Sequence, residues 1–147
     1  PWAHRTLIAR TLLGLEDHIT TDVVDWRMNP NGSWSFNEEE EGATADSLHR
    51  EESLEGVYAR AFPGWKESGR IGTVPVLWDR KHSTIVNNES REIIRMFDAL
   101  SQSGLGNGTS LCPEPLKKEI DAMIDANYEA VNNGVYKSGF ARTQDAY

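Results

Sequence analysis

Cysteine is almost absent from this 147-residue sequence, which contains only Cys112. A single cysteine cannot form an internal disulfide, and such sparse usage is typical of a reducing compartment. A long apolar run is also missing, because the longest covers residues 74–78, whereas a bilayer-spanning helix needs about 20 residues. No signal-peptide pattern occurs near Pro1. We therefore expect a cytoplasmic protein without a membrane partner, unless a targeting segment has been removed.

Basic side chains are too few to balance the acidic ones, since 15 Lys and Arg face 23 Asp and Glu and the net charge is −8. Nucleic-acid binding needs a basic face, so the composition argues against a nucleic-acid partner. The four histidines are scattered without the spacing of metal ligands, and we expect no metal site. The hydrophobic share of 38% and the charged share of 26% are typical of a globular domain.

The hydrophobic pattern predicts alternating helices and strands. Helical spacing of apolar residues predicts three helices, at residues 1–14, 47–62 and 89–100. β-rich composition predicts three strands, at residues 19–26, 73–78 and 84–86. Between the first strand and the second helix, residues 27–42 are rich in turn formers and predict a long loop. This order is that of an α/β thioredoxin fold without its first strand.

A Gly- and Ser-rich stretch, residues 101–108, marks a domain boundary. We predict a thioredoxin-like domain over residues 1–100, a linker over residues 101–112, and the beginning of an all-α domain over residues 113–147. A further helix is predicted for residues 116–131.

A proline inside an apolar strand pattern, Pro75, is the first candidate functional feature. Proline cannot donate a hydrogen bond to a sheet, so Pro75 either lies on an edge strand or follows a cis peptide bond. In the cis case the backbone of Val74 is left available to an extended peptide ligand.

The second candidate feature is the helix start at Asn88, Glu89 and Ser90. Orphan N–H groups and a serine hydroxyl can bind a carboxylate, and Glu89 can hold an ammonium group. Ordinary helix capping by Asn87 or Asn88 is the alternative explanation. Together the two features describe a site for an extended peptide with a free amino-acid end, as in glutathione.

Five blocks of sequence then carry a family resemblance. They are PWAHR at residues 1–5, GRIGTVPVLWD at residues 69–79, IVNNES and EIIRMF at residues 85–97, and VNNGVYKSGFA at residues 131–141. In this order they resemble the glutathionyl-hydroquinone reductases, the Xi class of glutathione transferases, over essentially the whole chain. The family's first motif is Cys-Pro-Trp-Ala-His-Arg, of which only the cysteine is missing here.

The resemblance implies a glutathione-binding thioredoxin-like domain followed by a helical domain, paired as a homodimer. It implies that Val74 offers its backbone to the cysteinyl part of glutathione and that Glu89 and Ser90 hold the γ-glutamyl head. Trp34 would cover the bound tripeptide, and Arg70 would pair with it ionically.

The implied reaction removes glutathione from glutathionyl-hydroquinones, with glutathione as co-substrate and Tyr136 lining the quinol pocket. A cysteine expected immediately before Pro1 attacks the thioether sulfur, and a second glutathione then releases oxidised glutathione. No role is expected for Cys112, which has no basic neighbour in the sequence.

Two other functions remain open. One is an omega-like glutathione transferase that acts as a thiol transferase or dehydroascorbate reductase, although the Asn-Asn-Gly-Val-Tyr context of Tyr136 favours the quinol-specific class. The other is a non-catalytic glutathione-fold binding module, which Ser or Ala before Pro1 would favour.

Overall fold

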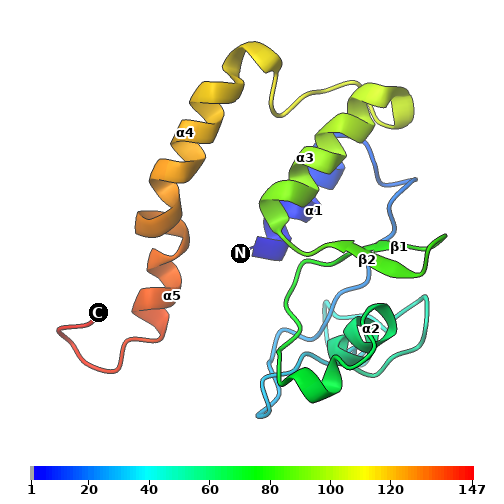
Figure 1. Cartoon of the computed structure of the whole chain (residues 1–147), viewed down its shortest axis with the longest axis vertical. Coiled ribbons are helices and arrows are strands. Elements are labelled where there is room, and N and C mark those ends of the chain that lie inside the picture. Colours follow the sequence, from blue (N-terminus) through cyan, green and yellow to red (C-terminus); the bar gives the residue numbers. More distant parts are fainter. Residues whose placement is uncertain (1) are drawn as a thin grey trace. The chain divides into compact units, whose positions relative to one another are not determined.

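The computed structural model describes residues 2–147 and separates the chain into two compact units, divided between Thr109 and Ser110. Figure 1 shows the elements of each unit. The first unit contains α1 (Trp2–Leu12), α2 (Leu54–Ala61), a 3-10 turn (Lys66–Ser68), β1 (Leu77–Asp79), β2 (Thr84–Asn87), α3 (Ser90–Leu100) and a π turn (Ser101–Leu105). The second contains a 3-10 turn (Glu114–Leu116), α4 (Lys117–Asn127), a π turn (Tyr128–Asn132) and α5 (Gly134–Gly139).

α1 and α3 pack against each other and form one half of the core of the first unit (Figure 1). Ile93 and Phe97 are only 1% and 4% exposed. Their spacing of four residues places them on one face of α3. Ala9, Leu13 and Leu15 are buried in α1 and just after it. Burial of these apolar stripes holds the two helices together.

The other half of this core surrounds α2. Leu54, Val57 and Tyr58 are buried on this helix. Partly buried side chains from the loops and the hairpin pack against them, namely Val24, Trp34, Phe36, Trp65, Val74, Val76, Trp78 and Ile85. The segment around Val74 is therefore anchored to α2 by apolar packing.

β1 and β2 form an antiparallel hairpin in which Asp79 pairs with Thr84. The Asp79 carboxylate accepts hydrogen bonds from the N–H groups of Lys81 and His82 at 2.8 and 2.9 Å, which closes the turn. The predicted strand over residues 73–78 is right only at its end, because the ladder begins with β1.

Residues 19–26 do not form the strand that their composition predicts. The carbonyl of Val23 accepts a hydrogen bond from the N–H of Thr44 at 2.8 Å, so the segment bonds to a loop. It also lines a cavity of about 320 Å³ together with residues 74–78. A strand needs a neighbouring strand for its backbone groups, and the described residues supply none here.

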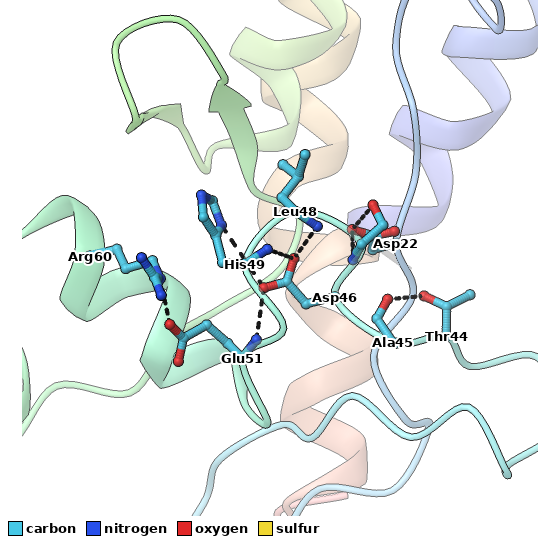
Figure 2. A network of polar contacts seen from close by, with 9 residues as sticks. Asp22, Thr44, Ala45, Asp46, Leu48, His49, Glu51 and Arg60 are labelled. Carbon is cyan, nitrogen blue, oxygen red and sulfur yellow. Dashed lines mark hydrogen bonds and ion pairs between the residues drawn. The ribbon is translucent and has the colours of Figure 1, made fainter.

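The helix predicted for residues 47–62 forms only in its second half, as α2. Figure 2 shows the cause, which is the buried carboxylate of Asp46. It accepts hydrogen bonds of 3.0 to 3.3 Å from three backbone N–H groups, those of Leu48, His49 and Glu51. Arg50 has a φ of 58°, outside the helical region. These local bonds replace the first turns of the predicted helix.

Residues 101–109 are a packed part of the first unit. Ser101 is fully buried, and its hydroxyl donates to the carbonyl of Leu13 at 3.3 Å. The N–H of Asn107 donates to the same carbonyl at 3.0 Å. These bonds satisfy a carbonyl at the C-terminal end of α1. The stretch predicted as a linker, residues 101–112, is thus divided between the two units.

In the second unit α4 continues through a π turn into α5 (Figure 1), in the region where residues 116–131 predict a helix. None of the residues in these elements is buried. Within residues 2–147 there is no helix with the length and apolar character that crossing a membrane requires.

Candidate functional site

The first part of the candidate site is the backbone of Val74. The Val74–Pro75 peptide bond is cis, which confirms the cis alternative. Val74 is half-buried, yet within residues 2–147 neither its N–H nor its carbonyl forms a hydrogen bond. Such a pair of backbone groups is what an extended peptide needs for strand-like pairing.

The second part is the start of α3. Ser90 is the first helical residue and is 2% exposed, whereas the side chain of Glu89 is 61% exposed. Glu89 is the N-cap, and its carboxylate accepts from the N–H of Arg91 at 3.4 Å. The capping role predicted for Asn87 or Asn88 therefore belongs to Glu89. The helix dipole favours an acidic side chain at this position.

A side-chain hydrogen bond joins the two parts of the site. Nδ2 of Asn88 donates to Oγ1 of Thr73 at 2.9 Å. The buried Tyr58 donates its hydroxyl to the carbonyl of Thr73, also at 2.9 Å. Because Thr73 directly precedes Val74, these two bonds fix the candidate backbone site relative to the start of α3. The sequence gives no signal for a role of Thr73 or Tyr58, because their pairing forms only in the folded chain.

Arg5 reaches the start of α3 from α1. Its Nε and Nη2 both donate to Oγ of Ser90, at 2.9 and 2.7 Å, and Nη2 lies 3.9 Å from Oε1 of Glu89. The guanidinium also lies over the ring of Trp2, 4.6 Å from its centroid. Arg5 belongs to the PWAHR motif, but its 85-residue separation from Ser90 leaves no local signal in the sequence for their contact.

Trp34 and Arg70 are not connected to the start of α3. Within residues 2–147, no hydrogen bond or ion pair joins either side chain to Glu89 or Ser90. Trp34 is half-buried against α2, and its carbonyl accepts from the N–H of Leu54 at 2.8 Å. Arg70 is exposed. Their contacts with a bound tripeptide stay predictions.

Tyr136 belongs to the second unit, where it is half-buried on α5. Its N–H donates to the carbonyl of Asn133 at 3.1 Å. Its place beside a quinol stays a prediction. Cys112 is half-buried in the same unit, and its N–H donates to the hydroxyl of Ser110 at 3.2 Å.

The cavity of about 320 Å³ in the first unit includes Val74 and Pro75 in its lining but neither Glu89 nor Ser90. It therefore adjoins the candidate site without containing it. Among the residues that the structure describes, no three His, Cys, Asp or Glu side chains gather as a set that could hold a metal.

Residues 1–100 match the family described as Glutathione S-transferase, N-terminal domain. This chain belongs to the glutathione S-transferase family. The match covers the Val74 backbone and the start of α3, the two parts of the candidate site. The predicted α/β fold class is thereby confirmed, as a thioredoxin-like N-terminal domain of a glutathione transferase followed by a helical region.

Three relatives of this glutathione transferase chain are informative. The glutathionyl-hydroquinone reductase YqjG from Escherichia coli is 49% identical over all of the chain and 44% of its own length. Its glutathione-bound structure superposes with a TM-score of 0.90 over all of the chain and 47% of that structure. A glutathione S-transferase omega-like 2 from Schizosaccharomyces pombe is 48% identical over all of the chain and 47% of its own length.

The third relative is an Xi glutathione transferase from Saccharomyces cerevisiae in complex with glutathione. It is 34% identical, with a TM-score of 0.88 over all of the chain and 51% of that structure. The resemblance to the Xi class and to the glutathionyl-hydroquinone reductases is therefore confirmed over the whole chain. The chain spans about half the length of the curated relatives it matches.

Proposed function

We propose that the protein containing this chain uses glutathione to reduce glutathionyl-hydroquinones to hydroquinones. The observation that carries the proposal is the link between the Val74 backbone and the start of α3, made by the 2.9 Å hydrogen bond from Asn88 to Thr73. This bond fixes the backbone of Val74 relative to Glu89 and Ser90. The proposal is supported because the Val74 backbone suits strand-like pairing with the cysteinyl part of glutathione, and Glu89 and Ser90 suit its γ-glutamyl head. Two relatives with bound glutathione support the same ligand.

The nucleophile of the proposed reaction is a cysteine immediately before Pro1. Its thiolate attacks the sulfur of the glutathionyl-hydroquinone, a Cys–glutathione disulfide forms, and the carbon–sulfur bond breaks. The electron pair stays on the quinol ring, which takes up a proton. The thiolate of a second glutathione attacks the mixed disulfide, which releases oxidised glutathione and restores the cysteine. A position beside the N-terminus of α1 would lower the pKa of this thiol.

The substrates are glutathione and glutathionylated quinols, and we propose that the protein acts on them as a homodimer in the cytoplasm. Two rival activities give different results on the same enzyme. Faster turnover of dehydroascorbate than of glutathionyl-hydroquinones would favour an omega-like transferase. Glutathione binding without any turnover would favour a non-catalytic module.

The test is a product analysis on the full protein. A glutathionyl-hydroquinone incubated with glutathione should give hydroquinone and oxidised glutathione in equal amounts, measured by chromatography. Oxidised glutathione alone should add one glutathionyl group, which mass spectrometry maps to the residue before Pro1. A Cys112→Ser variant serves as the control and should keep full activity. An adduct on Cys112 in the parent protein would contradict the assignment of the nucleophile.

A further inference from the structure

The hydroxyl of Ser90 is held in an unusual hydrogen-bonding state at the start of α3. A serine hydroxyl has one hydrogen to donate and two lone pairs that accept. Both Nε and Nη2 of Arg5 donate to this oxygen, at 2.9 and 2.7 Å. Ser90 as a whole residue is only 2% exposed. With its acceptor positions occupied by Arg5, the hydroxyl retains only the role of a donor.

The acceptor that this hydroxyl has within the chain is a poor one. Oε1 of Glu89 lies 3.5 Å from Oγ of Ser90, at the long limit of a hydrogen bond. A ligand carboxylate beside the start of α3 would be a better acceptor, because an ionised acceptor shortens and strengthens an O–H hydrogen bond. A ligand group that only donates, such as an ammonium, would find no lone pair on Ser90.

Arg5 also changes the charge that a ligand meets there. The exposed carboxylate of Glu89 would repel a carboxylate placed next to it, and Nη2 of Arg5 lies 3.9 Å from that carboxylate. The guanidinium also lies over the ring of Trp2, which helps to hold it in place. A guanidinium stays protonated at every physiological pH, so this compensation is permanent.

We propose that Arg5 is a positioning residue that makes the start of α3 selective for the α-carboxylate of a γ-glutamyl head group. This inference rests on the proposed function, because it names how the same site recognises glutathione. Arg5 acts through Ser90 rather than by touching the reacting sulfur. Because Arg5 lies on α1, it connects the recognition of the head group to the helix that follows the proposed nucleophile.

The experiment compares three ligands by titration calorimetry on the full protein. They are glutathione, 4-aminobutyryl-cysteinylglycine, which lacks the α-carboxylate, and glutaryl-cysteinylglycine, which lacks the α-amino group. In the parent protein, loss of the carboxylate should weaken binding about tenfold or more, the scale of one charge-assisted hydrogen bond. In Arg5→Gln this penalty should shrink to within about threefold, while the penalty for losing the amino group persists.

Ser90→Ala removes the hydroxyl that Arg5 contacts, and it should reduce the carboxylate penalty to the same extent as Arg5→Gln. Adding Arg5→Gln to the Ser90→Ala variant should change the carboxylate penalty no further, because both substitutions remove the same Arg5–Ser90 interaction. Arg5→Lys keeps the charge and cannot occupy both lone pairs in fixed geometry, so it tests the same point if Arg5→Gln does not fold. Melting temperatures of all variants identify any loss of folding.

The results separate this inference from the proposed function. A parent protein that does not bind glutathione would overturn both. Normal glutathione binding with an unchanged carboxylate penalty in Arg5→Lys and Arg5→Gln would overturn the role of Arg5 alone. If the Arg5 variants bound all three ligands more weakly by the same factor, Arg5 would have a purely structural role, and the inference would be overturned.

Discussion

At the scale of single residues, each charged group of glutathione needs a partner of opposite charge or a hydrogen-bond donor in the candidate site. Glutathione carries one ammonium and two carboxylates at neutral pH. Glu89 can hold the ammonium, and Ser90 backed by Arg5 suits the carboxylate beside it. The second carboxylate, at the glycyl end, needs another cation. Arg70 is the arginine that the family resemblance assigns to ionic pairing with glutathione.

Arg70→Ala should therefore weaken glutathione binding. A charge-assisted hydrogen bond is worth about 1.5–3 kcal/mol, but Arg70 is exposed and solvent screens it, so we expect about 1 kcal/mol. The loss should shrink as salt is raised, because screening already weakens the pair in the parent protein. Calorimetry at two salt concentrations measures both effects. Arg80→Ala, another exposed arginine, is the control, and equal affinity of Arg70→Ala and the parent would remove Arg70 from the site.

Some residues of the candidate site could be proposed from the sequence, and others could not. Val74, Glu89 and Ser90 could be found, because a proline within a strand pattern and a capped helix start leave local signals. Arg5 and Thr73 could not, because their partners lie far away in sequence and meet them only after folding. The sequence thus points to the groups that we propose face the ligand, and it gives no signal for the residues that position them.

At the scale of elements, the end of α1 depends on close packing with the stretch after α3. A Cβ on Gly106 would overlap the carbonyl oxygen of Leu13 and lie 2.9 Å from Cα of Ser101. Both neighbours are backbone and cannot rotate away. Gly106→Ala should therefore destabilise the first unit by about 1–3 kcal/mol, the usual cost of overpacking.

Denaturant unfolding measures this change, with Gly139→Ala as the control. Gly139 has open space where a Cβ would be, so its substitution should change the free energy of unfolding very little. If Gly106→Ala were as stable as the control, residues 101–109 would not be packed on α1 as described.

The hairpin turn between β1 and β2 should respond to acid through Asp79. The pKa of its carboxyl is lowered from 3.8, first by the hydrogen bond with the His82 side chain and then by the N–H groups of His82 and Lys81. A lowered folded-state pKa contributes stability that is present above the unfolded-state pKa. That stability is lost as the pH falls through the folded-state pKa.

Asp79→Asn removes this titration while it retains a side-chain oxygen. The parent should have the higher melting temperature above about pH 5, and the difference should fall as the pH is lowered toward about 2. Melting curves across this range test the expectation, with Asp17→Asn as an exposed control. A difference that stays constant with pH would show that the carboxylate charge of Asp79 does not stabilise the turn.

For some helices and strands, the secondary structure predicted from the sequence differs from the secondary structure in the folded chain. α1 and α3 form where the pattern predicts helices, because their apolar stripes are buried against each other. Residues 47–53 have the same kind of pattern, yet the carboxylate of Asp46 captures their backbone N–H groups (Figure 2). Residues 19–26 have strand composition but no neighbouring strand among the described residues. Pattern alone cannot predict such competition, because it depends on which partners are present.

At the scale of the whole molecule, the first unit carries the proposed glutathione site and the second carries Tyr136. The proposed substrate has a tripeptide end and a quinol end, and the family resemblance assigns Tyr136 to the quinol end. When the carbon–sulfur bond breaks, negative charge develops on the quinol ring and its oxygens. A phenol positioned beside that charge can donate a hydrogen bond or a proton to it.

Tyr136→Phe removes the hydroxyl and keeps the ring, so glutathione affinity and melting temperature should remain unchanged. Turnover of glutathionyl-hydroquinones should fall by about 10²–10⁴-fold, the usual contribution of general acid catalysis. Turnover of a small glutathione mixed disulfide should change little, because its thiolate leaving group needs no such proton. Steady-state kinetics on both substrates measure this selectivity. Tyr128→Phe is the matched control from the same unit and should spare both activities. Equal losses on both substrates, or a lower melting temperature without selectivity, would assign Tyr136 to packing and contradict its role at the quinol.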